Sequence, residues 1–310
     1  MRSTAILSLS LCSGAAALQL TAVRPVVRPA VARRLDCDIV CGWGPDPVWT
    51  ANKIETITEA SNGLKAITIV PPTKDDFTIP GQYLQIKEPG AEKAGIFAIA
   101  SAPGKEGAFE FLIKEQPPSD WSPGTGSAVS VVRTAKLAPA PHSALAHNPW
   151  LALSRRWLTS APVGTELEMS QVMGPGFKCT DGALEGVTDV MLFAVGSGIS
   201  PVRSVIESGV LEGKSVSLYY GAQTPEQMAY TDKFDAWEKL GCKVTAVISK
   251  PEGTEWKGAT GYVQDVAKAA GVPKPDSTVM LICGMKGMAE GVKALAADVG
   301  VAEENVRANF

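Results

Sequence analysis

The stretch from Asp189 to Ile206, DVMLFAVGSGISPVRSVI, decides half of the fold. It begins as an apolar run, passes through Gly196-Ser197-Gly198, and continues with Ser200 and Pro201. A continuous apolar run bounded by glycine is typical of a parallel strand that is buried on both faces. Serine favours the N-cap of a helix and proline its first position. We therefore predict a buried strand, a glycine loop and a helix with Ser200 as its N-cap.

A glycine loop that leads into a helix suits the pyrophosphate of a dinucleotide. Glycine lets the backbone approach a ligand closely, and the N–H groups at a helix N-terminus attract anions. The motif departs from the complete G-x-G-x-x-G fingerprint, because Pro201 stands in place of the third glycine. Taken alone, it is equally consistent with an ordinary turn between a strand and a helix.

The sequence that follows alternates between further strands and helices. Strand character recurs in Ser215–Ala222, Cys242–Ser249 and Thr278–Cys283, and helical character in Pro225–Leu240, Gly261–Ala270 and Gly287–Val299. This alternation predicts right-handed crossovers and a parallel sheet. Ligands bind at the carboxyl ends of the strands in such a sheet. Those ends carry the glycine loop, Ser249-Lys250 and Cys283-Gly284.

Several motifs together resemble the ferredoxin–NADP reductase family. Val195–Pro201 (VGSGISP), Tyr220–Thr224 (YGAQT) and Cys283–Met288 (CGMKGM) resemble its nucleotide-binding half, and Pro80–Leu84 (PGQYL) resembles its flavin-barrel motif. The likeness covers roughly Trp43 to Phe310, and a set of motifs in the right order is far more specific than any single one.

The resemblance implies a chain of two domains. An N-terminal antiparallel β-barrel over residues 43–182 would bind FAD, and a C-terminal α/β domain with a parallel sheet over residues 186–310 would bind a nicotinamide nucleotide. The barrel half agrees, because four segments with strand character are separated by turn signals rich in proline and glycine. These segments are Asn52–Glu59, Leu64–Val70, Gln82–Lys87 and Phe109–Ile113.

The resemblance also implies which residues meet the flavin, and the chain departs from the family there. Tyr83 belongs to the barrel motif, and the sequence GIFAIAS, from Gly95 to Ser101, occupies the place of the family's Arg-x-Tyr-Ser motif. Gly95 replaces the arginine that meets the FAD pyrophosphate, and Ala98 replaces the serine that reaches flavin N5. Phe97 stands where an aromatic ring packs on the isoalloxazine, and Ser101 offers a replacement hydroxyl.

Gly126 and Ser127 resemble the second flavin element of the family, a glycine loop whose backbone binds phosphate. A charge-assisted contact to phosphate contributes ~1.5–3 kcal/mol. The missing arginine therefore lowers the expected FAD affinity by roughly one to two orders of magnitude. We predict that FAD still binds, and the alternative is a relic barrel that binds no flavin.

On the nucleotide side, Ser249, Lys250 and Tyr262 match the family positions around the adenosine 2′-phosphate. Many members carry arginine where this chain has Lys250, and lysine supplies a point charge instead of a bidentate fork. An acidic residue on the ribose hydroxyls would indicate NAD. None stands at these positions, although Glu252 and Glu255 are near. The pattern favours NADPH and leaves NADH open.

Two residues are expected at the reacting rings. In the family, the cysteine that matches Cys283 lies beside the nicotinamide, next to Gly284, and a terminal aromatic residue that matches Phe310 covers the flavin. The alternatives are that Cys283 is a small buried hydrophobe and that Phe310 fills the core.

The residue composition excludes other chemistry. The only histidines are His142 and His147, and none follows Gly196-Ser197-Gly198. This excludes a Ser-His-Asp hydrolase of α/β-hydrolase order. The six cysteines are scattered without a C-x-x-C pair, which argues against a zinc ribbon or an iron–sulfur cluster. We predict no metal site and chemistry that comes mainly from an organic cofactor.

Residues 1–34 are expected to be a targeting presequence. They combine a short apolar core, Ala5–Leu18, with five arginines and no acidic residue. The core is too short to span a bilayer, and the two parts in tandem suggest import into a plastid. Glu168–Gly174 and Met228–Phe234 resemble the plastid reductase-like branch of plants, which agrees with a chloroplast-type location. Secretion and a disordered tail are the alternatives.

Residues 130–156 show no strand alternation, so we expect an insertion in the barrel, since long structureless loops are uncommon in compact domains. The whole chain has a formal net charge of −3, and removal of residues 1–34 leaves 24 basic against 32 acidic residues. This balance argues against nucleic acid as a partner. It also gives no sign of the basic face that an acidic ferredoxin would need.

Together, these features predict a flavin-dependent oxidoreductase that transfers hydride between NAD(P)H and FAD. The sequence does not name the electron acceptor, for which an electron-transfer protein is a candidate. A non-catalytic nucleotide-binding or assembly protein on a degenerate reductase fold is the alternative, and the missing arginine and serine favour it.

Overall fold

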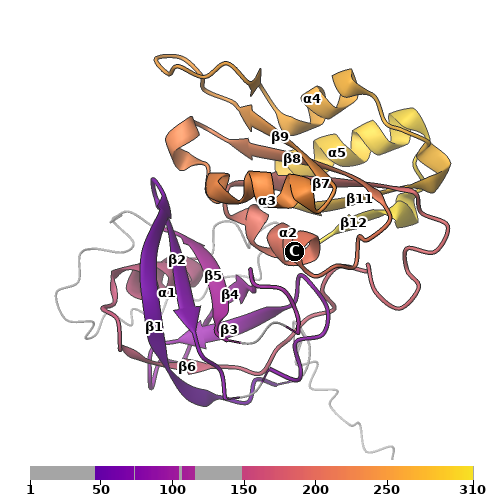
Figure 1. Cartoon of the computed structure of the whole chain (residues 1–310). Coiled ribbons are helices and arrows are strands. Elements are labelled where there is room, and N and C mark those ends of the chain that lie inside the picture. Colours follow the sequence, from indigo (N-terminus) through magenta and orange to yellow (C-terminus); the bar gives the residue numbers. More distant parts are fainter. Residues whose placement is uncertain (1–45, 73, 105–106, 116–148, 310) are drawn as a thin grey trace, which may run out of the picture. The chain divides into compact units, whose positions relative to one another are not determined.

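The computed structural model describes residues 46–72, 74–104, 107–115 and 149–309 of the 310-residue chain (Figure 1). All of them lie within one compact unit, Gly42–Phe310. Three predicted features lie outside the described residues: the presequence, the glycine loop at Gly126 and Ser127, and the terminal Phe310. Most of the predicted insertion, up to residue 148, also lies outside them.

The N-terminal sheet is antiparallel and has six strands. They are β1 (Thr50–Ser61), β2 (Leu64–Ile69), β3 (Tyr83–Lys87), β4 (Gly95–Ala98), β5 (Phe109–Lys114) and β6 (Glu166–Met169), in the order β4-β3-β6-β1-β2-β5. The backbone N–H of Ala100, just after β4, donates to the carbonyl of Glu110 in β5 at 2.7 Å. This bond joins the two ends of the sheet, as the predicted antiparallel barrel requires.

The barrel closes around an apolar core to which nearly every strand contributes. Its fully buried members include Ile54, Ile67, Ile69, Leu84, Ile86, Phe109 and Phe111. Gly63 adopts a positive φ of 78° in the turn between β1 and β2, a conformation that glycine reaches without steric strain. Of the six strands, β4 and β6 were not among the segments predicted as strands.

Helix α1 (Pro149–Ser160) runs without a break through residue 156, where the predicted insertion was expected to end. Leu158 on this helix is fully buried in the barrel core, and Trp157 packs against that core. The end of the helix therefore belongs to the packing of the barrel, and the predicted boundary falls inside a helix. The predicted domain bounds otherwise stay a prediction.

The C-terminal sheet is parallel and also has six strands. They are β7 (Asp189–Val195), β8 (Ser215–Ala222), β9 (Cys242–Ile248), β10 (Ala259–Thr260), β11 (Thr278–Cys283) and β12 (Val306–Ala308), in the order β10-β9-β8-β7-β11-β12. Each neighbouring pair is parallel. The predicted α/β fold with a parallel sheet is confirmed.

Helices cover both faces of this sheet, which explains the continuous apolar run of β7. Val190, Leu192 and Ala194 pack with α2 (Ile199–Glu207) and with Trp237 of α3 (Phe234–Lys239). Met191 and Phe193, which alternate with them along β7, pack with α4 (Val263–Ala270) and α5 (Lys286–Val299). Figure 1 shows the two helix pairs on opposite sides of the sheet. Every position of β7 up to Ala194 is therefore buried.

Two local predictions are wrong. The helix predicted over Pro225–Leu240 is broken, because Tyr230 adopts a left-handed conformation with φ 60° and only Phe234–Lys239 is α-helical. The helix after the glycine loop begins at Ile199, so Ser200 is inside it and Gly198 holds the cap position. A 3-10 turn over Gly196–Gly198 leads directly into this helix, and the N–H of Ile199 bonds the carbonyl of Gly196.

Candidate functional site

The residues predicted at the carboxyl ends of the parallel strands do meet at one edge of the sheet. Val195 at the end of β7 pairs with Gly221 of β8, and Ala194 pairs with Cys283 at the end of β11. The glycine loop follows β7 directly and Gly284 follows β11. In a parallel sheet this edge is where a ligand binds.

The two glycines of the loop are needed for different reasons. Gly196 adopts a positive φ of 56°, and a Cβ built on it would meet no atom within 4 Å. A Cβ on Gly198 would overlap the carbonyl of Cys283 and lie 3.0 Å from the nitrogen of Gly284. Gly196 thus leaves open space above the loop, while Gly198 lets the loop contact the end of β11. This arrangement fits a phosphate group, which needs an uncovered backbone.

Ser197 is half-buried in the 3-10 turn, whereas Ser200 and Pro201 are buried in the first turn of α2. The hydroxyl of Ser200 donates to the carbonyl of Ala98 at 3.1 Å. Ser200 therefore links the loop predicted to bind the nucleotide to the strand end predicted to meet the flavin.

The predicted flavin residues lie at the ends of β3 and β4. Tyr83 pairs with Ala98 across these strands, and burial raises the pKa of the Tyr83 hydroxyl. The Tyr83 ring lies against Gly174, where a Cβ would overlap it. Phe97 is only 6% exposed and packs in the barrel core. The carbonyl of Ser101 accepts a bond from Ser204 at 2.9 Å.

Cys283 is held by the end of the chain. Its thiol donates to the carbonyl of Asn309 at 3.4 Å, and the Asn309 side-chain amide donates to the carbonyl of Gly81 at 2.9 Å. Burial raises the pKa of the Cys283 thiol to about 12, so the thiol stays protonated at neutral pH and is a poor nucleophile. Asn309 was not predicted as a site residue.

The predicted 2′-phosphate residues lie on neighbouring strand ends. Thr260 of β10 pairs with Ile248 of β9, so Tyr262 and Lys250 each follow a paired position by two residues. The backbone N–H of Lys250 donates to the carbonyl of Gln223 at 2.8 Å, and that of Ser249 to Ala222 at 3.0 Å. The Lys250 side chain is exposed, and Tyr262 is 63% exposed. The Lys250 ammonium group and the Tyr262 ring are therefore both exposed to solvent at the carboxyl edge of the sheet.

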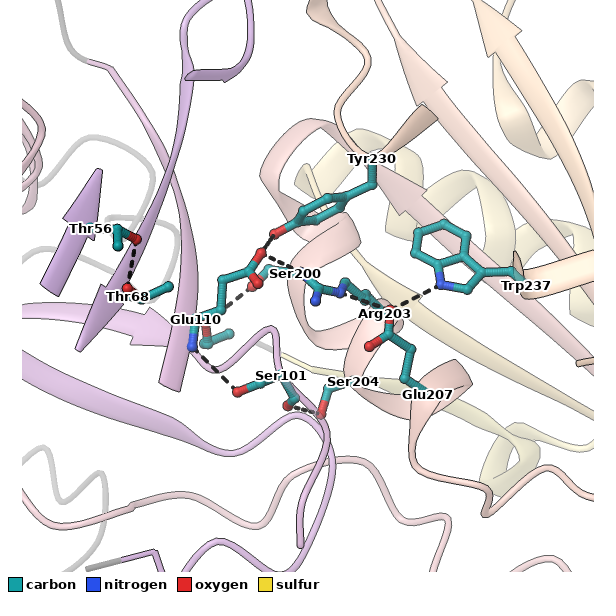
Figure 2. Close-up of polar contacts among 11 residues, drawn as sticks. Thr56, Thr68, Ser101, Glu110, Ser200, Arg203, Ser204, Glu207, Tyr230 and Trp237 are labelled. Atoms are coloured by element: carbon teal, nitrogen blue, oxygen red, sulfur yellow. Dashed lines mark hydrogen bonds and ion pairs between the residues drawn. The ribbon is translucent and has the colours of Figure 1, made fainter. Parts of the chain in front are cut away.

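Sequence reasoning missed a buried network of charged and aromatic side chains beside this edge (Figure 2). Arg203 of α2 forms an ion pair with Glu110 of β5 and another with Glu207 on its own helix, the latter at 2.9 Å. The Tyr230 hydroxyl donates to Glu110 at 2.9 Å, and the Trp237 indole N–H donates to Glu207 at 3.2 Å. A single glutamate in the apolar strand Phe109–Ile113 was the signal available in the sequence.

The electrostatics keep this network in one protonation state. Burial lowers the pKa of the Arg203 guanidinium, but the bond to Glu110 and the neighbouring negative charges outweigh burial and raise it above its ordinary value. Burial, followed by the charge of Glu110, raises the pKa of the Tyr230 hydroxyl well above its ordinary value. Arg203 therefore stays charged and Tyr230 stays a hydrogen-bond donor over the physiological pH range.

Within the residues that the structure describes, no three His, Cys, Asp or Glu side chains are grouped so as to hold a metal ion. In the same residues, no helix has both the length and the apolar character needed to cross a membrane.

Comparison with known proteins identifies relatives by sequence. The family model of the oxidoreductase NAD-binding domain matches residues 192–294. The chain is 31% identical over 276 residues to fruit protein pKIWI502 of Actinidia deliciosa, and the alignment covers 84% of this chain and 76% of that protein. It is also 31% identical over 107 residues to an NADH-cytochrome b5 reductase-like protein of Arabidopsis thaliana. That alignment covers 33% of this chain and 32% of the Arabidopsis protein.

A solved structure shares the fold over most of the chain. The ferredoxin NADP+ reductase from Neisseria gonorrhoeae with bound FAD and NADP aligns with a TM-score of 0.62 and 16% identity, and covers 86% of this chain and 100% of that one. The kiwi relative is similar over most of both chains, and the NAD-binding match falls on the parallel sheet. With these relatives and this two-sheet fold, the chain belongs to the ferredoxin–NADP reductase-like family of flavin- and NAD(P)-dependent oxidoreductases.

Proposed function

We propose that the protein transfers hydride between NADPH and FAD and passes the electrons to a separate acceptor. The observation that carries this proposal is the hydrogen bond from Ser200 to Ala98, because it joins the predicted nucleotide loop to the predicted flavin edge. FAD, when bound, would accept a hydride and release electrons singly or in pairs. The protein's part is to hold two rings in contact and to exclude water.

The residues fit the nucleotide better than the flavin. Gly196 leaves the loop open, and Lys250 supplies a positive charge at the edge of the sheet. On the barrel side, Tyr83 and Ala98 form the strand end, but neither Ala98 nor Gly95 offers a side-chain donor to the flavin. We therefore expect FAD to bind and to exchange with the solution more readily than in family members that carry the arginine.

The first test is reconstitution of the purified full chain with excess FAD, followed by removal of free flavin. The bound flavin should then lose its absorption band when NADPH is added without oxygen. A panel of acceptors, including a one-electron protein, a quinone and a dye, should restore the band at different rates and so identify the acceptor class. If the protein retained no flavin, the result would contradict the proposal that it is an oxidoreductase.

A second candidate function is nucleotide binding without catalysis, and Gly95 and Ala98 are the observation that favours it. It predicts that NADPH binds the chain in calorimetry while no flavin is retained. Flavin retention followed by reduction excludes it.

The preference for NADPH rests on Lys250. We expect Lys250→Ala to raise the KM for NADPH by roughly fivefold to tenfold, since an exposed charge contact is worth about 1 kcal/mol. The KM for NADH should change less because NADH lacks the 2′-phosphate, and kcat should stay nearly unchanged for both. Steady-state kinetics at two salt concentrations would measure this, and the NADPH effect should shrink with salt.

Lys243→Ala is the matched control, because Lys243 is an exposed lysine near the start of β9, the strand that precedes Lys250, and it lies away from the ligand edge. Equal losses for NADPH and NADH in Lys250→Ala would show that Lys250 does not bind the 2′-phosphate, and the NADPH preference would fall.

A further inference from the structure

One carboxylate oxygen of the barrel accepts hydrogen bonds from two side chains in the C-terminal half of the chain. Oε1 of Glu110 in β5 accepts bonds from the Arg203 guanidinium and from the Tyr230 hydroxyl, which are 93 and 120 positions away in the sequence. The Arg203 side chain is only 8% exposed and that of Glu110 is 21% exposed. Figure 2 shows the three side chains converging on one point between β5 and α2.

The same face of α2 carries two further bonds to the barrel. Ser200 donates to the carbonyl of Ala98 at 3.1 Å, and Ser204 donates to the carbonyl of Ser101 at 2.9 Å. Residues three and four apart lie on one side of a helix, so Ser200, Arg203 and Ser204 form a single contact strip. This strip begins close behind the glycine loop, at Ser200. At its other end, Ser204 contacts the segment that follows β4.

Tyr230 reaches this point because the chain breaks helical geometry. Its backbone is left-handed, with φ 60°, a conformation that a bulky residue rarely adopts. The break turns the ring over the Arg203 guanidinium, with 4.6 Å between the guanidinium carbon and the ring centre, and aims the hydroxyl at Glu110. Strain of this kind persists only where the surrounding structure enforces it, and it is concentrated at functional sites.

We propose that Glu110, Arg203 and Tyr230 form a clamp that sets the position of the glycine loop relative to the flavin edge of the barrel. The inference rests on the proposed function, since only hydride transfer between two bound rings needs such a setting. None of the three is assigned a contact with substrate or cofactor, so they are positioning residues. A misplacement of about 1 Å at reacting rings can lower a rate by about a hundredfold, which is why a clamp would matter.

The chain offers a matched control in Glu207. This carboxylate also binds Arg203, at 2.9 Å, but it lies on the same helix, and it accepts a bond from Trp237 of the C-terminal half. Glu207→Gln therefore perturbs the same arginine through a pair that lies within one helix, whereas Glu110→Gln perturbs the pair that joins the two halves of the chain. Glu110→Gln and Tyr230→Phe keep side-chain shape and remove, respectively, the charge and one donor of the clamp.

The test measures flavin reduction in the stopped flow with FAD-loaded full-length protein and saturating NADPH. In Glu110→Gln the limiting rate should fall by about tenfold to a hundredfold, and in Tyr230→Phe by less. The dissociation constant for the nucleotide and the flavin content should stay within about twofold of the unchanged chain, because positioning acts on the rate and uniform binding acts on KM. Glu207→Gln should retain most of the rate.

A second readout needs no turnover. Amide hydrogen exchange of the segment from residue 228 to 233 should be faster in Glu110→Gln than in the unchanged chain, because Tyr230 loses its charged acceptor. The same segment should be unaffected in Glu207→Gln, since Glu207 does not bond Tyr230 in the network described above.

Three results would overturn the clamp. They are an unchanged limiting rate in Glu110→Gln, whether or not nucleotide binding weakens, an equal loss of rate in Glu207→Gln, and unchanged hydrogen exchange at residues 228–233 in Glu110→Gln. If the protein without substitutions reduced no flavin, that result would instead overturn the proposed function, and the clamp's role with it. The two failures are distinguishable, because the unchanged chain is measured first.

Discussion

Replacement of Gly198 by alanine is expected to produce the largest loss of nucleotide-dependent flavin reduction of any change in the glycine loop. The added Cβ would overlap the carbonyl of Cys283 and crowd the nitrogen of Gly284. Both neighbours are backbone atoms of β11 and its following turn, so they cannot move aside as the end of a flexible side chain can. The strand ends of β7 and β11 would have to separate at the ligand edge.

Overpacking that forces side chains and backbone to shift destabilises by about 1–3 kcal/mol, and we expect the upper end of this range because both contacted groups are backbone. The reduction rate with NADPH should fall by about a hundredfold or more, because the loop and Cys283 shift together. Urea unfolding and nucleotide calorimetry on the folded fraction would separate the loss of stability from the loss of binding.

Gly196→Ala is the internal control for the same loop. Gly196 has a positive φ of 56° and open space where the Cβ would go. Its replacement should therefore destabilise the fold only by the strain of a left-handed residue, about 1–2 kcal/mol. If Gly198→Ala unfolded at the same urea concentration as the unchanged chain, the close contact between the loop and β11 would not constrain the site.

The centre of the C-terminal sheet is predictable from the sequence, because β7, β11 and most of β8 are buried on both faces. Strands β8 and β11 match the predicted segments at both ends, since a largely apolar run between polar or glycine-containing segments leaves little freedom in assignment. The edge strands β10 and β12 have two and three residues. Strands so short carry no period that could be recognised, and only their pairing with β9 and β11 defines them.

Helix signals were less decisive where tertiary contacts overrode them. The sequence from Pro225 to Leu240 has apolar positions that suit a single helix, yet Tyr230 leaves helical geometry to place its hydroxyl on Glu110. A contact 120 positions away in the sequence cannot be read from local periodicity. The predicted insertion had the same weakness, because the burial of Leu158 in the barrel core is also a long-range contact.

The same contrast between local sequence patterns and long-range contacts applies to the candidate site. The placement of Gly196, Ser249 and Cys283 at one edge could be predicted, because the carboxyl ends of parallel strands share that edge. Glu110 and Arg203 could not be paired in advance, since each lies in a largely apolar element of a different half and the local sequence does not show which distant charge it meets. Asn309 was missed for a related reason, because its partners at Gly81 and Cys283 are defined by the folded chain alone.

The second large effect is expected for Arg203→Met, which removes the cation that two carboxylates share. Glu110 and Glu207 would remain with side-chain exposures of 21% and 12% and would lose the guanidinium of Arg203. Loss of one partner of a buried ion pair destabilises by about 3–5 kcal/mol, because an uncompensated charge stays in a poorly solvated site. Urea unfolding at neutral pH should show a drop of this size.

A rescue experiment separates charge from packing as the cause. Adding Glu110→Gln and Glu207→Gln to Arg203→Met removes both orphaned charges, and each glutamine oxygen can still accept the bond from Tyr230 or from Trp237. The triple variant should recover most of the lost stability, since a buried ion pair replaced by neutral groups of similar size is often close to neutral in stability. Neighbouring changes of this kind are strongly non-additive, so the triple variant should be more stable than Arg203→Met alone. If Arg203→Met lost less than about 1 kcal/mol, or if the triple variant were the least stable of the set, the carboxylates would not be relying on Arg203.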